Sequence, residues 1–181
     1  MRLSAGGAGR FCVAVDVHYL SVGASPSARA RAAVVTAADP TFAVVLLERT
    51  MVVTDVPPYR PGQFYLRELP PLRAVLAGLG DQEGLGLIVV DGYVDLDPDG
   101  RPGLGAYVHD EFGVPVIGVA KSAFRSATHA IPVLRGFSAR PLFVTAAGMP
   151  RIAAAELVRA MAGAFRLPDA LRRADALARG G

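Results

Sequence analysis

Three short, almost unbroken apolar segments constrain the fold of this chain more than any other feature. They are FCVAVDV at 11–17, LGLIVVDG at 85–92 and VPVIGVAK at 114–121. None alternates polar with apolar residues, so each is predicted to be a strand covered by helices on both faces, as in a parallel sheet. Each ends at or beside a charged residue, Asp16, Asp91 or Lys121. Because the carboxyl ends of parallel strands meet at one edge of a sheet, we expect these three side chains to converge.

A helix predicted over 63–79 supplies another charged residue for the same edge. Its apolar stripe, spaced by three and four residues, consists of Tyr65, Leu72, Val75 and Leu79. Glu68 falls on this stripe, at a position that the helical period reserves for the core. Carboxylates of Asp16, Glu68 and Asp91 brought so close would repel one another unless a cation lay among them. The pattern therefore predicts an acidic, cation-binding site.

The remaining periodicity predicts one α/β domain over 1–181. Before the helix at 63–79 we expect a strand at 10–17 and an antiparallel pair at 29–37 and 42–53, and we expect Pro70 and Pro71 to break that helix into two pieces. After it we expect strands at 86–91, 114–120 and 141–148 and helices at 104–112, 151–165 and 168–179. An antiparallel meander followed by parallel strands gives a mixed sheet of five or six strands flanked by helices. Ribonuclease H-like folds have this order.

Composition narrows the class of protein. The chain has 181 residues, a net charge of +3, one cysteine and no apolar run of membrane-spanning length, so we expect a cytoplasmic protein without a membrane partner. Lysine and arginine together number 19, and every one except Lys121 is arginine. The ammonium of a lysine is a point charge that suits a phosphate oxygen or an attacking water. A mildly basic chain is compatible with a polyanionic partner.

Seven motifs in one order resemble the endonuclease V family, enzymes that nick nucleic acid near deaminated adenine. They are VAVDV in the first strand, PYRPG followed by FYLRELPPL, VDG at 90–92, GLGAYVH at 103–109, VPVIGVAK at 114–121, PLFVTAAG at 141–148 and RLPDALRRADALA at 166–178. The PYRPG turn and the GVAK strand end are the most specific of them. The resemblance implies hydrolysis of a phosphodiester bond near inosine, in DNA or RNA.

The resemblance also implies roles for particular residues. Asp16, Glu68 and Asp91 match the metal-binding carboxylates of the family, and hard oxygen ligands suit Mg²⁺ or Mn²⁺. Lys121 matches the active-site lysine beside the scissile phosphate.

Recognition of the damaged base is implied for a second group. Tyr59, with Pro58, Arg60 and Pro61, matches a wedge that enters the duplex where the base rotates out. Gly62 and Gly92 match positions where backbone approaches the extruded hypoxanthine.

Two departures from the family pattern keep other interpretations open. A histidine expected after PLFVTAAG, to complete the metal site, is replaced by Met149, and Val94 stands where a glycine is expected to face the damaged base. One alternative is therefore a catalytically weak or inactive relative that binds nucleic acid or a protein. Another is a metal site that acts on a small nucleotide-like substrate.

Overall fold

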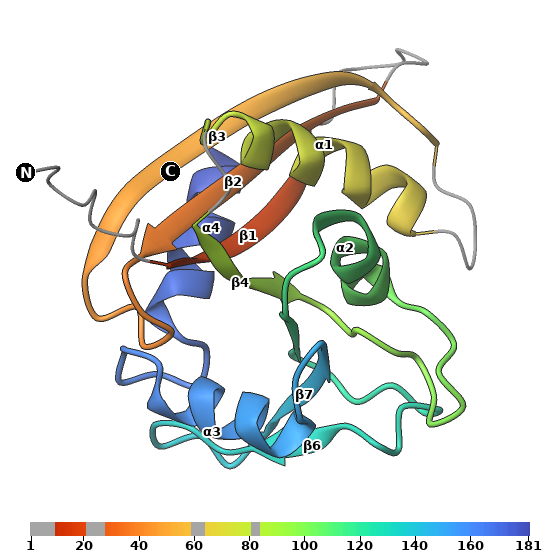
Figure 1. Cartoon of the computed structure of the whole chain (residues 1–181), viewed down its shortest axis with the longest axis vertical. Coiled ribbons are helices and arrows are strands. Elements are labelled where there is room, and N and C mark those ends of the chain that lie inside the picture. Colours follow the sequence, from red (N-terminus) through yellow and green to blue (C-terminus); the bar gives the residue numbers. More distant parts are fainter. Residues whose placement is uncertain (1–9, 21–27, 59–63, 81–83) are drawn as a thin grey trace, which may run out of the picture.

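The computed structural model describes residues 10–20, 28–58, 64–80 and 84–181, which form a mixed seven-stranded sheet with helices on both faces (Figure 1). The strands are β1 (Phe11–Leu20), β2 (Ala28–Ala37), β3 (Val45–Val56), β4 (Leu85–Asp91), β5 (Val116–Ala120), β6 (Ile131–Val133) and β7 (Leu142–Ala147). Their spatial order is β3-β2-β1-β4-β5-β7-β6. The meander β1–β2–β3 is antiparallel, and β1, β4 and β5 are parallel. The predicted fold class is confirmed.

Four helices in the described residues cover the sheet. They are α1 (Tyr65–Ala77), α2 (Leu104–Phe112), α3 (Arg151–Ala160) and α4 (Asp169–Arg179). Val13 and Val15 of β1 enter a core shared with α1 and α2, whereas Cys12 and Ala14 enter a second core shared with α3 and α4. Successive strand residues point to opposite faces, so an unbroken apolar run is what a strand between two helical layers requires. None of the helices in the described residues is long and apolar enough to cross a membrane.

Two local expectations about elements were wrong. Helix α1 is continuous through Pro70 and Pro71. The prolines remove two backbone hydrogen bonds, but Leu72 and Val75 behind them are fully buried, and this burial holds both halves of the helix on the sheet. The sheet also has a seventh strand, β6, which was not predicted because it has three residues, one of them Pro132.

The direction of β7 matters most for the site. It pairs antiparallel with β5, with Val116 opposite Ala147 and Ala120 opposite Phe143. An apolar run of this kind fits a parallel or an antiparallel strand equally well. Because β7 is antiparallel, its last residues lie at the edge where the parallel strands begin, away from the edge where they end.

Candidate active site

The ends of the parallel strands place three charged side chains together. In the register between β1 and β4, Val15 lies opposite Val90, so Asp16 and Asp91 follow side by side. Lys121 comes directly after β5, and its Nζ donates a hydrogen bond to Asp91 Oδ2 at 2.5 Å. These contacts are the ones expected if the carboxyl ends of the three apolar runs meet.

Glu68 faces this edge from the first turn of α1. Its side chain is buried, with 6% of the residue exposed, and the hydroxyl of Tyr19 on β1 donates to its Oε1 at 2.8 Å. The guanidinium carbon of Arg67 lies 3.9 Å from the centre of the Tyr19 ring. The tyrosine is thus clamped between an arginine and a carboxylate, and it fixes the orientation of Glu68.

The electrostatics of these carboxyl groups are strongly perturbed. Burial raises the pKa of Glu68 from 4.5 to about 8, with further contributions from the charges of Asp16 and Asp91. Burial, followed by the charge of Asp91, raises the pKa of Asp16 from 3.8 to about 7. Burial alone would lower the pKa of Lys121, but its hydrogen bond to Asp91 and the surrounding carboxylates raise it overall, so it stays an ammonium. The cluster carries more negative charge than its own cations compensate.

A fourth carboxylate, Asp175 on α4, joins the cluster and was missed in the sequence. Its charge raises the pKa values of both Asp16 and Lys121, and it forms an ion pair with Arg179 at 3.0 Å. Leu171, four residues before it, is buried in the core. A carboxylate one helical turn from a core leucine is the same signal that identified Glu68. Here it was hidden because an aspartate four residues before an arginine also fits an ordinary surface ion pair.

The donor set suits a hard divalent cation, although the side chains are not gathered around one. Among the described residues no three of the types His, Cys, Asp and Glu lie close enough to hold an ion as they stand. Three of the four carboxylates turn one oxygen to a protein donor: Asp16 Oδ1 to the Val17 N–H at 2.8 Å, Glu68 Oε1 to Tyr19, and Asp91 Oδ2 to Lys121. No donor from the described part of the chain reaches their second oxygens. These second oxygens are carboxylate oxygens of the kind that Mg²⁺ and Mn²⁺ prefer.

A pocket of about 230 Å³ adjoins this cluster. Its lining includes Phe64, Tyr65, Asp91, Gly92 and Leu104. Gly92 has φ +138, and a Cβ there would meet nothing within 4 Å, so the backbone faces open space. At Gly118, in contrast, a Cβ would lie 2.6 Å from the Gly92 carbonyl oxygen, so the absence of a side chain on β5 lets the loop after β4 lie close to the sheet.

Val94 does not enter this pocket, which corrects the expectation that it faces the base. Its side chain is 1% exposed and packs in the core beneath α2, where a Cβ on Gly105 would lie 2.6 Å from a Val94 methyl group. Its backbone N–H donates to Thr145 Oγ1 at 2.8 Å. The loop turns between Gly92 and Val94, so the extra side chain fills core instead of the pocket.

Met149 lies at the opposite edge of the sheet from Asp91, which corrects the second expectation. It packs beside Cys12, Gly86 and Pro115, at the beginnings of β1, β4 and β5. A histidine after β7 could not complete a metal site at the ends of these strands. The replacement of that histidine therefore says nothing about the acidic cluster.

Most of the predicted wedge lies outside the described residues. Tyr59, Arg60, Pro61 and Gly62 belong to the segment 59–63, and Pro58, which is described, is exposed just before it. Phe64 resumes the described chain, is 47% exposed and lines the pocket beside Asp91.

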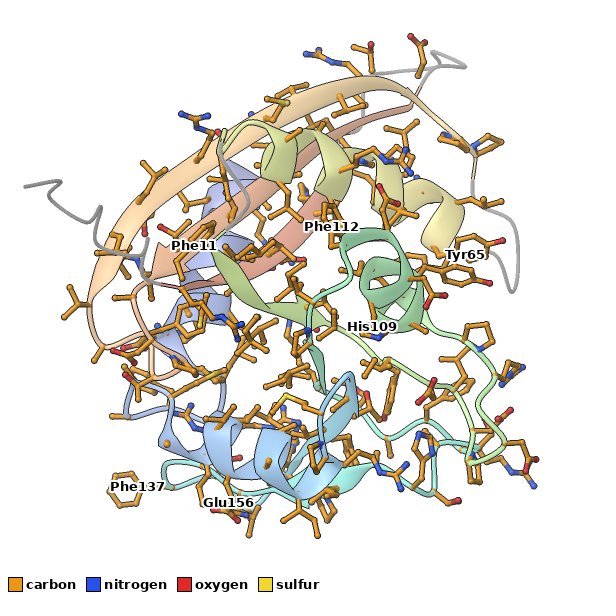
Figure 2. The ribbon with its side chains drawn as sticks, viewed as in Figure 1. Phe11, Tyr65, His109, Phe112, Phe137 and Glu156 are labelled. Carbon is orange, nitrogen blue, oxygen red and sulfur yellow. The ribbon has the colours of Figure 1, made fainter. Side chains whose placement is uncertain are left out.

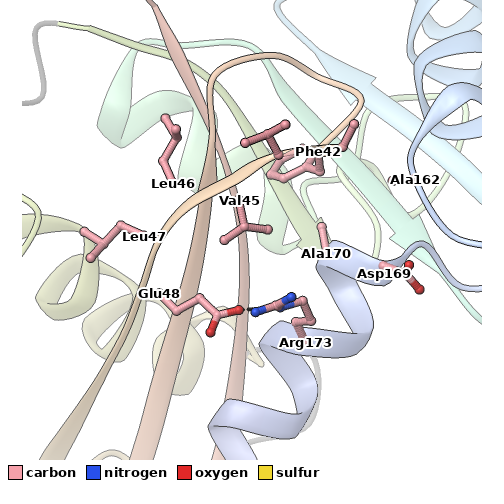
Figure 3. Close-up of a pocket in the computed structure, with 11 residues that line it drawn as sticks. Phe42, Val45, Leu46, Leu47, Glu48, Ala162, Asp169, Ala170 and Arg173 are labelled. Atoms are coloured by element: carbon pink, nitrogen blue, oxygen red, sulfur yellow. Dashed lines mark hydrogen bonds and ion pairs between the residues drawn. The ribbon is translucent and has the colours of Figure 1, made fainter.

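A larger hollow of about 580 Å³ lies between the start of β3 and the start of α4 (Figure 3). Phe42 and Ala170 line it, and Glu48 pairs with Arg173 across it. None of the four carboxylates of the cluster lines this hollow. It is a separate feature from the candidate site.

The fold and the cluster define an α/β protein of ribonuclease H-like architecture with an acidic site at the ends of its parallel strands. The family model for endonuclease V matches residues 4–148, a stretch that includes Asp16, Glu68, Asp91 and Lys121. The chain belongs to the endonuclease V family. Helix α4, with Asp175, lies beyond the matched stretch.

Two curated relatives are similar in sequence. Endonuclease V of Streptomyces coelicolor is 36% identical over 158 residues, covering 75% of this chain and 65% of that protein. Endonuclease V of Streptomyces avermitilis is 33% identical over 155 residues, covering 75% of this chain and 66% of that protein. The aligned part of the chain thus spans just under two thirds of the length of these relatives.

Solved structures support the same fold. A crystal structure of endonuclease V from Streptomyces avermitilis matches with a TM-score of 0.72 and 32% identity, covering 94% of this chain and 81% of that one. Endonuclease V of Ciona intestinalis, in complex with a 24mer DNA containing an inosine followed by a ribo-adenosine, matches with a TM-score of 0.77 and 18% identity, covering 94% and 84%. At that identity the second match bears on the fold alone.

Proposed function

We propose that the protein is a metal-dependent endonuclease that hydrolyses a phosphodiester bond near inosine in DNA or RNA. The observation that carries this proposal is the cluster of Asp16, Glu68, Asp91 and Asp175 beside Lys121. Glu68 is buried and Asp16 is half-buried, and carboxylates placed so close together cost stability unless a cation lies among them. Membership of the endonuclease V family supports the reaction, and the inosine-containing DNA bound to the Ciona relative supports the substrate.

Asp16, Glu68 and Asp91 would hold Mg²⁺ or Mn²⁺ through their second oxygens, with Asp175 close by. A bound divalent cation supplies activation of water and neutralisation of charge on the phosphate. Tyr19 holds one oxygen of Glu68 at 2.8 Å, which leaves the other to face the ion. Lys121 keeps its proton, so its ammonium can stabilise negative charge on a phosphate placed beside Asp91.

The pocket beside Asp91 would receive the extruded base. The bare backbone at Gly92 permits a close approach by the edge of a ring, and the aromatic rings of Phe64 and Tyr65 offer it flat apolar surfaces. Tyr59, with Pro58, Arg60 and Pro61, would fill the space that the base leaves in the duplex, and Gly62 would let backbone approach the extruded base. The reacting phosphate would then lie between the base pocket and Lys121.

A cleavage assay tests the proposal. End-labelled DNA and RNA strands with one central inosine, and matched strands with adenine, are incubated with Mg²⁺, Mn²⁺ or EDTA. We expect metal-dependent nicking near the inosine, loss of nicking in Asp16→Asn and Asp91→Asn, and normal nicking in Asp110→Asn, which alters an exposed carboxylate on α2. Folded protein that nicks none of these strands would instead favour a binding module without catalysis.

A further inference from the structure

Two phenylalanines on neighbouring loops are exposed to an unusual degree. Phe137, in the loop after β6, is fully exposed, and Phe165, between α3 and α4, is 60% exposed. Figure 2 shows Phe137 projecting away from the body of the protein at its edge. Both rings line a hollow of about 600 Å³, which we call the Phe137–Phe165 surface. Exposed apolar side chains that gather at one place often mark an interaction site.

The two loops are held rigidly against each other. Arg135 is 6% exposed, and its guanidinium donates to the carbonyl oxygen of Phe165 at 3.0 Å and to that of Gly163 at 3.2 Å. Gly136 adopts φ +58, and a Cβ there would lie 2.4 Å from the carbonyl oxygen of Ala164. The backbone that carries the two rings is therefore already formed. Binding of a ligand to them loses little conformational entropy in these loops.

The charges around the rings favour an anionic ligand. The guanidinium carbon of Arg172 lies 4.3 Å from the centre of the Phe165 ring, and its charge is shared with Asp169 at 3.2 Å. Arg140, at the end of the Phe137 loop, forms no ion pair with any described residue, and Arg166 lines the hollow. Flat apolar rings interleaved with arginines are the pattern of surfaces that stack the bases of single-stranded nucleic acid.

One side chain connects this surface to the candidate active site. The guanidinium of Arg166 donates to the carbonyl oxygen of Pro141 at 2.8 Å, to that of Arg140 at 3.0 Å, and to that of Lys121. Lys121 in turn contacts Asp91. Ala120 lies opposite Phe143 and Val133 opposite Leu142, so the loop that bears Phe137 lies at the same edge of the sheet as Lys121, and a strand whose phosphate lies beside Lys121 would have the Phe137–Phe165 surface along this edge.

We propose that Phe137 and Phe165 stack bases of an unpaired stretch of nucleic acid that continues from the cleaved bond. In a duplex the faces of the bases are covered by their neighbours, so only an unpaired stretch can offer them to exposed rings. The protein would then prefer an inosine beside a single-stranded region over one deep inside a continuous duplex. This inference rests on the proposed function only for the position of the cleaved bond, since stacking itself needs neither metal nor catalysis.

Binding measured by fluorescence anisotropy in EDTA tests the stacking. The probes are a single-stranded oligonucleotide, a strand of the same length made of abasic units, and a blunt duplex. The Phe137→Ala, Phe165→Ala double variant should bind the single strand more weakly by about tenfold or more and bind the other two probes unchanged. A Phe137→Tyr, Phe165→Tyr variant should restore binding, and Ile152→Ala, which removes an exposed apolar side chain on α3, should change nothing.

The outcomes separate the two proposals. Equal losses on the abasic and normal strands, or no loss at all in a variant of unchanged melting temperature, would overturn base stacking and point to another ligand, such as a protein. On an inosine substrate with a single-stranded flank, the double alanine variant should raise KM and leave kcat unchanged. If the native protein cleaves nothing, the proposed function fails, whereas the binding comparison in EDTA still decides the stacking.

Discussion

Replacing Glu68 by glutamine should stabilise the metal-free protein, and increasingly so as the pH rises. The folded protein holds the Glu68 proton up to a pKa of about 8, whereas the unfolded chain releases it near 4.5. Between these values folding takes up a proton, so the native protein loses about 1.4 kcal/mol of stability per pH unit from this group alone. The full span of the shift corresponds to about 5 kcal/mol, and because the charge of Asp16, whose own pKa is about 7, contributes to the shift of Glu68, we expect about 2–4 kcal/mol to be realised.

Glutamine keeps an acceptor for the Tyr19 hydroxyl and carries no charge. In EDTA above pH 8 the Glu68→Gln variant should therefore melt about 5–10 °C higher than the native protein, and near pH 4.5 the two should melt together. Thermal unfolding across this pH range measures the difference. Mn²⁺ should raise the melting temperature of the native protein more than that of the variant, because the cation replaces the missing proton.

Asp91→Asn is the matched control for this experiment. It breaks the contact with Lys121 at 2.5 Å and should not stabilise the metal-free protein. Melting temperatures of the native protein and Glu68→Gln that run parallel from pH 4.5 to 8 would refute the assignment of an uncompensated charge to Glu68. A variant stabilised equally at every pH would point to improved packing instead.

Three further predictions address other parts of the site. Tyr19→Phe removes the hydrogen bond to Glu68, and at a pH where Glu68 is charged it should weaken Mn²⁺ binding measured by calorimetry, by about 10–100-fold as for other partners of metal ligands. Asp175→Asn should slow cleavage by a similar factor in a single-turnover assay, whereas Met149→Ala, at the opposite edge of the sheet, should leave the rate unchanged. Val94→Ala should cost about 1–3 kcal/mol in urea unfolding without altering the preference for inosine over adenine, because the side chain lies in the core; a changed preference would return Val94 to the base pocket.

The sequence predicts the centre of the sheet well because burial on two faces leaves an unmistakable pattern. The runs that form β1, β4 and β5 contain almost no polar residue. Because these strands are parallel, the charged residues at their carboxyl ends lie at the same edge of the sheet. Glu68 was found because it interrupts an apolar helical stripe. Asp175 was missed because its ion pair with Arg179 imitates a solvent-exposed helix, and only the packing of α4 on β1 and β2 brings it to the cluster.

Strand direction is the property that the sequence does not encode locally, and one such direction changes the interpretation of this protein. If PLFVTAAG formed a parallel strand, Gly148 and Met149 would stand beside Asp91, and the loss of a histidine there would argue against a working metal site. Because β7 runs antiparallel to β5, the same residues pack beside Cys12 and Pro115, and that argument disappears.

At the edge where the parallel strands end, the acidic cluster carries more negative than positive charge. Asp16, Glu68, Asp91 and Asp175 face three cations of the protein, Arg67, Lys121 and Arg179, so one negative charge is left over when all four carboxylates are ionised. With pKa values of about 7 and 8, Asp16 or Glu68 can take up a proton to remove that excess. A divalent cation bound among the carboxylates would also remove it. If a divalent cation binds there, as we propose, it would take the place of the proton that the cluster holds without it, and this exchange is what a cation-dependent hydrolase needs near neutral pH.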